Sequence, residues 1–73
     1  MLRAINVRVN NVLPGGIENK QPKQFMKNYI NKTPMKRMAL SSEVASAVIF
    51  LLSDASSYIT GIDLVVDGGY TSL

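Results

Sequence analysis

The sequence predicts an α/β fold in which two strands are joined by a long crossover that contains two helices. Apolar and polar residues alternate from Ile5 to Asn10, which is typical of a half-buried strand, and the breakers Pro14–Gly16 follow. A second short apolar run, Ile62–Val66, is closed by Asp67–Gly69. Because the intervening chain is long enough for a crossover, we expect the two strands to pair in parallel.

The crossover contains a first, amphipathic helix from about Pro22 to Asn31. Phe25, Met26, Tyr29 and Ile30 recur at three- and four-residue spacing, with lysines on the other side. Thr33-Pro34 ends this helix, because the residue before proline is pushed out of the helical region. We interpret Met35–Leu40 as a loop. Met1–Ala4 is compatible with the last turn of an earlier helix, and nothing in these four residues resembles a helix N-terminus.

The second helix runs from about Ser42 to Ser53, and Ser41 or Ser42 is the expected N-cap. Between Val44 and Leu52 the only polar residue is Ser46, so this helix has to be buried on nearly all sides. A chain of 73 residues cannot easily provide that cover. Asp54–Ser57 is a polar turn. Because parallel strands are normally covered on both faces and flanked by further strands, the whole chain resembles the edge of a larger parallel sheet.

Composition excludes several classes of site. The chain has no cysteine and no histidine, so disulfides, thiolate or imidazole metal sites and Cys/His or Ser/His nucleophile pairs are all excluded. We expect no metal. The longest apolar run, Val44–Leu52, is too short to span a bilayer, and the first residues lack the apolar core of a signal peptide. We therefore expect a soluble, cytoplasmic protein.

An ordered set of short motifs covers nearly the whole chain and resembles the C-terminal third of the short-chain dehydrogenase/reductase family. The motifs are Val7-Arg8-Val9-Asn10, Pro14-Gly15, Pro34-Met35-Lys36-Arg37-Met38, Glu43-Val44-Ala45, Phe50-Leu51-Leu52-Ser53-Asp54, Tyr58-Ile59-Thr60-Gly61 and Val65-Val66-Asp67-Gly68-Gly69.

The resemblance implies a C-terminal fragment of a Rossmann-type doubly wound parallel sheet, with Ile5–Val12 as its sixth strand and Ile62–Val66 as its seventh. It divides one partial domain into three parts. Residues 1–17 hold a strand and a cofactor-site turn, residues 18–40 form a segment like the family's substrate lid (the lid-like segment), and residues 41–73 hold a buried helix and the last strand. Relatives pair through the last helix and strand, which implies a homo-oligomer or assembly with the remainder of a parent enzyme.

The family resemblance also implies a nicotinamide cofactor, NAD or NADP, and hydride transfer to or from a carbonyl or alcohol substrate. Pro14 and Gly15 would lie beneath the nicotinamide ring, and the backbone of Ile17 would bond its carboxamide. Asn19 stands where relatives commonly have threonine, and it still offers a side-chain hydrogen bond.

The family's catalytic residues are absent from these 73 residues. No G-x-x-x-G-x-G occurs, and no tyrosine is followed at four residues by lysine: Tyr29 is followed by Thr33 and Tyr58 by Ile62. We expect the chain alone to be inactive, with no catalytic residue of its own. The alternative reading is a non-catalytic interaction fragment that folds on a partner subunit.

Several residues have both a structural and a functional reading. Asn10 and Asn11 are expected to fix the backbone near the sheet edge, and Gly61 and Gly68-Gly69 to shape the chain around the last strand. Asp67 is expected to have a structural or subunit-contact role. The apolar face of the first helix, with Phe25, Met26 and Tyr29, either lines a substrate pocket or packs in the core.

A basic stretch without acids runs through the lid-like segment, and its residues are Lys20, Lys23, Lys27, Lys32, Lys36 and Arg37. Its plainest reading is a solvated surface. Nucleic-acid binding is not expected, because aromatic and basic residues are not interleaved. The reading that stays open is that the lysines help to hold a phosphorylated or carrier-linked substrate.

Overall fold

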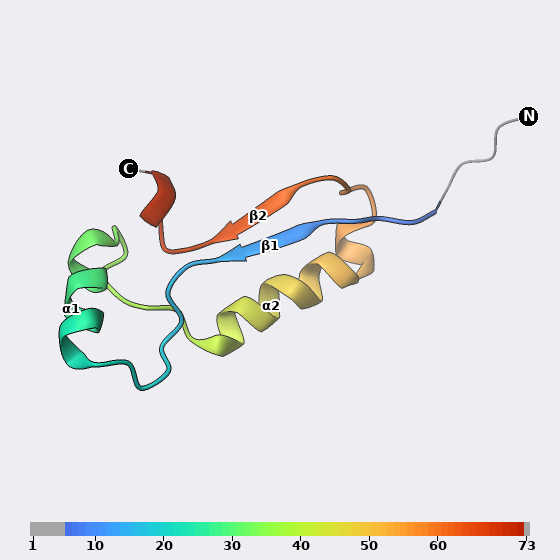
Figure 1. Cartoon of the computed structure of the whole chain (residues 1–73). Coiled ribbons are helices and arrows are strands. Elements are labelled where there is room, and N and C mark those ends of the chain that lie inside the picture. The colour runs from blue at the N-terminus through green and yellow to red at the C-terminus, as the bar shows by residue number, and fades with distance from the viewer. Residues whose placement is uncertain (1–5, 73) are drawn as a thin grey trace, which may run out of the picture.

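A computed structural model of the protein describes residues 6–72. Its elements, in chain order, are strand β1 (Asn11–Pro14), helix α1 (Lys23–Lys32), helix α2 (Ser41–Leu52), the short 3-10 helix η1 (Asp54–Ser56), strand β2 (Asp63–Val66) and the 3-10 helix η2 (Tyr70–Ser72). The two strands lie side by side with α2 along them, while α1 lies beyond their carboxyl ends (Figure 1). The helical turn expected at Met1–Ala4 lies outside the described residues.

The two strands pair in parallel, as the sequence predicts, and Asn11 pairs with Asp63 while Pro14 pairs with Val66. The prediction that the first strand covers Ile5–Val12 is wrong in its bounds. A strand needs a ladder partner, and β2 begins only at Asp63, so Val9 and Asn10 bond to the Thr60 side chain and to loop backbone instead. At its other end β1 includes Pro14, whose missing N–H leaves the pairing with Val66 intact.

Asn10 links the chain entering β1 to the chain entering β2. Its Nδ2 donates to the Ile59 carbonyl at 3.0 Å, and its Oδ1 accepts from the Ile62 N–H at 3.1 Å. One residue earlier, the Val9 carbonyl accepts from the Gly61 N–H at 2.8 Å, and Gly61 has a φ of 76°. These bonds confirm the structural reading of Asn10 and Gly61.

Both helices form within one residue of their predicted bounds, and α1 ends at Thr33 as expected. The cap of α2 is different: its N-cap is Leu40, and neither Ser41 nor Ser42 caps it. The Glu43 carboxylate accepts from the Leu40 N–H at 2.9 Å, and the Glu43 N–H donates to the Leu40 carbonyl at 2.9 Å. The Glu43 side chain therefore supplies the reciprocal half of a capping box, although Leu40 at the N-cap has no side-chain acceptor of its own.

The last turn of α2 is closed by side chains from two other segments. The Arg8 guanidinium donates to the carbonyls of Ile59 and Leu51, both at 3.0 Å, and more weakly to that of Ser53 at 3.4 Å. The Ser56 hydroxyl, which is 1% exposed, lies 2.8 Å from the Phe50 carbonyl oxygen. These contacts satisfy carbonyls that a helix end leaves without partners.

The apolar core is small. Among residues 6–72, the buried apolar side chains are Met38 and Leu51, at 4% and 8% exposure. On α2, Ile49 and Leu52 are exposed, Leu52 by 80%, so the described chain does not bury this helix on all sides. The radius of gyration is 15.8 Å, whereas a compact domain of this length has about 11 Å. No helix in the described part is long and apolar enough to cross a membrane.

Candidate functional site

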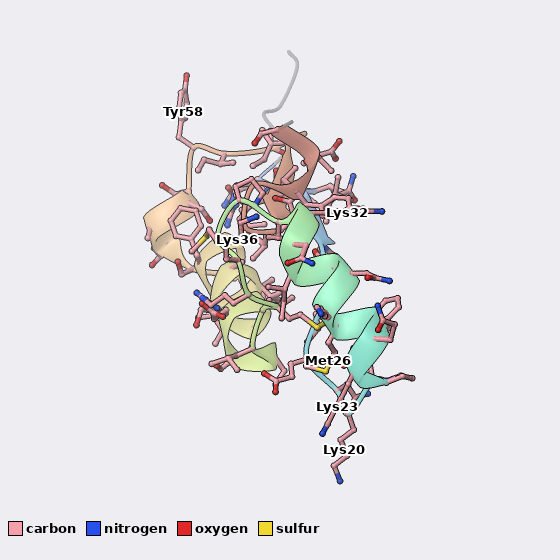
Figure 2. The ribbon with its side chains drawn as sticks, turned by 90° about the vertical axis from the view of Figure 1, so that its left-hand side faces the viewer. Lys20, Lys23, Met26, Lys32, Lys36 and Tyr58 are labelled. Carbon is pink, nitrogen blue, oxygen red and sulfur yellow. The ribbon has the colours of Figure 1, made fainter. Side chains whose placement is uncertain are left out.

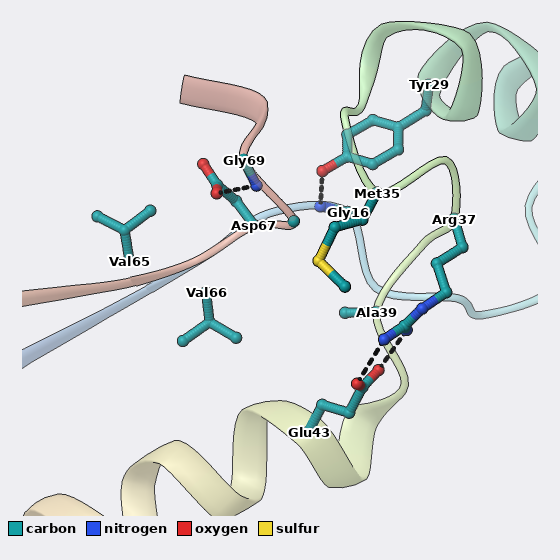
Figure 3. Close-up of a pocket in the computed structure, with 11 residues that line it drawn as sticks. Gly16, Tyr29, Met35, Arg37, Ala39, Glu43, Val65, Val66, Asp67 and Gly69 are labelled. Carbon is teal, nitrogen blue, oxygen red and sulfur yellow. Dashed lines mark hydrogen bonds and ion pairs between the residues drawn. The ribbon is translucent and has the colours of Figure 1, made fainter. Parts of the chain in front are cut away.

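The candidate site lies at the carboxyl ends of the two strands, where the chain leaves β1 through Pro14 and turns. The Gly15 N–H donates to the Val66 carbonyl at 3.0 Å, which extends the strand pairing by one bond. The chain after β2 leaves at the same edge through Asp67 and two glycines (Figure 3). In open parallel sheets this edge is where ligands bind.

Beyond Gly15, the chain forms a single parallel bridge with the residues that precede α2. The Ala39 N–H donates to the Gly16 carbonyl at 2.9 Å, and the Glu18 N–H donates to the Ala39 carbonyl at 2.8 Å. In such a bridge the middle residue, Ile17, directs its own N–H and C=O to the opposite side. Its carbonyl accepts from Nε2 of Gln21, while its N–H has no hydrogen-bond partner within residues 6–72.

The four predicted cofactor residues are only partly brought together. Pro14, Gly15 and Ile17 follow one another along the turn, whereas Asn19 lies farther out on an exposed loop. The Asn19 N–H donates to Oε1 of Gln21 at 2.7 Å, so the Gln21 carboxamide ties Ile17 and Asn19 into one small loop. Sequence reasoning missed Gln21, because nothing in its spacing marks it.

A hollow of about 270 Å³ opens beside the turn (Figure 3). None of the four predicted residues lines it; its walls include Gly16, Tyr29, Met35, Arg37, Glu43 and Asp67. Tyr29 comes from α1, and its hydroxyl accepts from the Gly16 N–H at 2.6 Å. The sequence predicts only that Tyr29, with the rest of its apolar helix face, either lines a substrate pocket or packs in the core, and the structure places it in the wall of this hollow. Its contact with the turn could have been suspected from the pair of glycines, which leave room for a ring.

One wall of the hollow carries a paired charge. The Arg37 guanidinium donates to both carboxylate oxygens of Glu43, at 2.7 and 2.9 Å. The bonds from Arg37, followed by the one from the Leu40 N–H, lower the pKa of Glu43 from 4.5 to about 2, and the Glu43 carboxylate raises the pKa of Arg37. Glu43 is therefore ionised at neutral pH and cannot serve there as a proton donor.

Asp67 organises the turn after β2. Its carboxylate accepts from the Thr71 hydroxyl at 2.7 Å, the Thr71 N–H at 3.0 Å and the Gly69 N–H at 2.9 Å. The bonds from Thr71 are the main cause of a lowered pKa for Asp67. These contacts fit the structural role expected of Asp67.

Gly68 and Gly69 both have positive φ, and a Cβ on either would meet the Thr33-Pro34 segment at 3.0 Å. The Met35 N–H donates to the Gly68 carbonyl at 3.1 Å. The lid-like segment is therefore anchored at the turn after β2 as well as at the Ile17–Ala39 bridge.

The lysines of the basic stretch do not form a single cluster. Figure 2 shows Lys20 and Lys23 near one end of α1 and Lys32 and Lys36 near the other. The Lys36 ammonium is engaged locally, since it donates to the Asn31 carbonyl at 2.8 Å. This spread is what a solvated surface requires, and it provides no focused anion site.

The family model described as enoyl-(acyl carrier protein) reductase matches residues 1–71. The chain belongs to the short-chain dehydrogenase/reductase family. It is 43% identical over 67 residues to an uncharacterized oxidoreductase of Schizosaccharomyces pombe, covering 90% of this chain and 26% of that protein. It is 40% identical over 77 residues to cyclopentanol dehydrogenase of Comamonas testosteroni, covering 97% of this chain and 31% of the relative.

Among solved structures, a short chain dehydrogenase from Leptospira borgpetersenii with bound NAD+ matches with a TM-score of 0.83 and 48% identity. The match covers 88% of this chain and 25% of that one. The family's fold is the Rossmann-type sheet that the motifs indicate, and this chain corresponds to its C-terminal two strands and two helices. The chain thus spans about a quarter to a third of the length of these relatives.

Proposed function

We propose that this chain supplies the C-terminal part of the nicotinamide site of an oxidoreductase that transfers a hydride between NAD or NADP and a carbonyl or alcohol substrate. The observation that carries the proposal is the Ile17 N–H, which points away from its bridge without a partner in the described chain, at the carboxyl end of β1. Support comes from relatives that include a cyclopentanol dehydrogenase and a short chain dehydrogenase structure with bound NAD+.

The residues of the turn fit a flat ring that carries a carboxamide. Pro14 presents a rigid apolar surface to such a ring, while the Cβ sides of Gly15 and Gly16 are filled by Tyr29 and Asp67. The Ile17 N–H is a donor for the carboxamide oxygen, and the Asn19 side chain can add a further hydrogen bond. The nicotinamide, when bound, supplies the hydride chemistry, and these residues bind and orient it.

Proton transfer would have to come from residues outside this chain. Its sequence has no Tyr-x-x-x-Lys, and the bonds to Glu43 and Asp67 lower the pKa of both carboxyls. A lowered pKa keeps them ionised at neutral pH, where they can neither donate a proton nor take one up readily. The chain alone should therefore show no dehydrogenase activity. In the whole enzyme, the lid-like segment would cover the substrate.

The DNA upstream of the coding sequence offers one direct test. It should encode a Gly-rich phosphate loop and a Tyr-x-x-x-Lys, in the same or an adjacent reading frame. Unrelated sequence at that place would count against the proposal.

A binding experiment tests the turn itself. In the 15N-labelled chain, NAD+ should shift the amide resonance of Ile17 and leave that of Val65 unchanged. Replacing Ile17 by proline removes a donor that has no internal partner together with its own resonance, so in Ile17→Pro the response to NAD+ is read at the Gly16 and Glu18 amides, where it should be lost with little loss of stability. Glu18→Pro is the matched control: it removes the bond to the Ala39 carbonyl and should destabilise the bridge. No shift at Ile17 in millimolar NAD+ would contradict the proposed site.

A second candidate function is a non-catalytic chain that folds on a partner subunit, and the small core favours it. Among residues 6–72, only Met38 and Leu51 are buried apolar side chains, while Ile49 and Leu52 on α2 are exposed. Circular dichroism and size-exclusion chromatography discriminate the two functions. A well-folded monomer would argue against the interaction chain, whereas a chain that becomes helical only with a family member would support it.

A further inference from the structure

Tyr29 joins three segments that are far apart in sequence. Its hydroxyl accepts from the Gly16 N–H at 2.6 Å, and its ring stacks on Tyr70, with ring centroids 5.1 Å apart and planes 6° from parallel. Figure 3 shows the side chain reaching from α1 toward the turn. Because α1 has no buried residue, this one side chain is a substantial part of what holds the helix to the sheet end.

The turn is shaped to receive this ring. A Cβ added at Gly15 would lie 2.5 Å from the Tyr29 hydroxyl oxygen, and one at Gly16 would lie 2.8 to 3.0 Å from ring carbons. Neither glycine has a positive φ, unlike Gly61, so backbone conformation does not explain their presence. The space that Tyr29 occupies explains it, together with the nearby Asp67 Cβ at Gly15.

The hydrogen bonds around Gly16 fix two successive peptide planes. The plane between Gly15 and Gly16 is held by the bond from the Gly16 N–H to Tyr29, and the next plane by the bond from the Ala39 N–H to the Gly16 carbonyl. In a trans peptide the Ile17 N–H points opposite to that carbonyl. Because glycine peptide planes rotate readily, loss of either bond would loosen the direction of the Ile17 N–H.

We propose that Tyr29 is a positioning residue: it fixes the Gly15-Gly16 peptide, and through it the Ile17 N–H that binds the cofactor, while holding α1 against the turn. This role rests on the proposed function for its cofactor part. The pinning of the turn by Tyr29 does not depend on any cofactor, so the two can be tested separately.

The test compares Tyr29→Phe, which keeps the ring and removes the hydroxyl, with Tyr58→Phe. Tyr58 is 102% exposed and projects away from the rest of the molecule, so its hydroxyl is a matched control (Figure 2). In the full 73-residue chain, amide exchange at Gly16 should be about three- to tenfold faster in Tyr29→Phe, the factor that one hydrogen bond provides. Exchange in α2 and at Val65 should stay as in the unaltered chain, which a general loss of stability would not allow.

Titration with NAD+ forms the second part of the test, and Tyr29→Phe should weaken the Ile17 response by about the same three- to tenfold. Unchanged Gly16 exchange in Tyr29→Phe, or no protection of Gly16 in the unaltered chain, would overturn the positioning role. Faster Gly16 exchange with an unchanged NAD+ response would overturn its cofactor part. Absence of any response to NAD+ in the unaltered chain would instead count against the proposed function.

Discussion

The two ends of the sheet use hydrogen bonds differently. At the amino ends of the strands, the side chains of Arg8, Asn10 and Ser56 bond directly to loop and helix backbone. At the carboxyl ends, the chain turns through Gly15-Gly16 and Gly68-Gly69 and leaves a hollow and a backbone N–H without a partner in the described chain. One end of the sheet is closed by its own side chains, and the other keeps a hollow and a backbone donor, where we propose that the cofactor binds.

The largest effect should come from the amino end. Arg8→Met keeps an unbranched apolar side chain but leaves the Leu51 and Ile59 carbonyls without their charged donor, so we expect a loss of about 2 to 3 kcal/mol in the free energy of unfolding. Urea unfolding followed by circular dichroism measures it. Lys27→Met, at an exposed position of α1, is the control. If Arg8→Met and Lys27→Met lower the free energy of unfolding by the same small amount, the side chains at the amino ends of the strands do not contribute more to stability than those at the carboxyl ends.

Gly16→Ala probes the carboxyl end. Its Cβ would lie within 3.0 Å of the Tyr29 ring, so we expect a loss of about 1 to 2 kcal/mol through displacement of that ring. In a Tyr29→Leu background the same change should cost less, because the ring is gone. A double-mutant cycle by urea unfolding measures the coupling, and additive costs would show that the turn is not shaped around Tyr29.

A smaller effect is expected at Gln21, whose carboxamide bonds to both Ile17 and Asn19. Gln21→Met removes both bonds at nearly constant length and should cost about 0.5 to 1 kcal/mol. Amide exchange at Asn19 should rise with it. Gln24→Met, which removes only a bond to Asn28 within α1, should leave Asn19 unchanged. Equal Asn19 exchange in both variants would contradict the role of Gln21 in the turn.

The smallest effect is a pH dependence at the entry to α2. The pKa of Glu43 is about 2 in the folded chain and 4.5 when the carboxyl has no partners, as in the unfolded chain. As the pH falls, Glu43 of the unfolded chain is therefore protonated before Glu43 of the folded chain. The stabilisation by Glu43 is therefore complete above pH 4.5 and is lost as the pH falls toward about 2. Between these two pH values, the midpoint temperature of thermal unfolding should depend less on pH in Glu43→Gln than in the unaltered chain. Asp67, also lowered in pKa, keeps a residual slope in both proteins.

The sequence was most informative where local pattern decides the structure. Parallel pairing, both helices, the end of α1 at Thr33 and the backbone role of Asn10 all follow from periodicity, breakers and the family motifs. The extent of β1 did not follow, because a strand is bounded by where its partner begins. Leu40 was not predicted as the N-cap because a leucine offers no side-chain acceptor, although Glu43, which Arg37 holds in place, stands three residues after it at the capping-box spacing.

The hollow could not be predicted, because the segments that form it meet only in the folded chain, and the pair of glycines was the one sequence signal for the contact of Tyr29 with Gly16. Helical spacing showed which face of α1 is apolar, but it did not show which backbone group the Tyr29 hydroxyl would bond to. The predicted cofactor residues lie close together in sequence, and the family resemblance placed all of them from one motif. Arg37 and Glu43 come from separate segments and were not predicted as site residues, whereas Tyr29 was predicted either to line a pocket or to pack in the core.

The hydrogen bonds of Asn10 also bear on the register in which the two strands pair. Strands of four residues offer few rungs to choose between alternative alignments, and a slip by one would turn every side chain to the wrong face. Asn10 presents a donor and an acceptor in a side-chain amide, and they meet Ile59 and Ile62 only when Asn11 faces Asp63. A single asparagine just before β1 thus favours one register of the two strands over its neighbours.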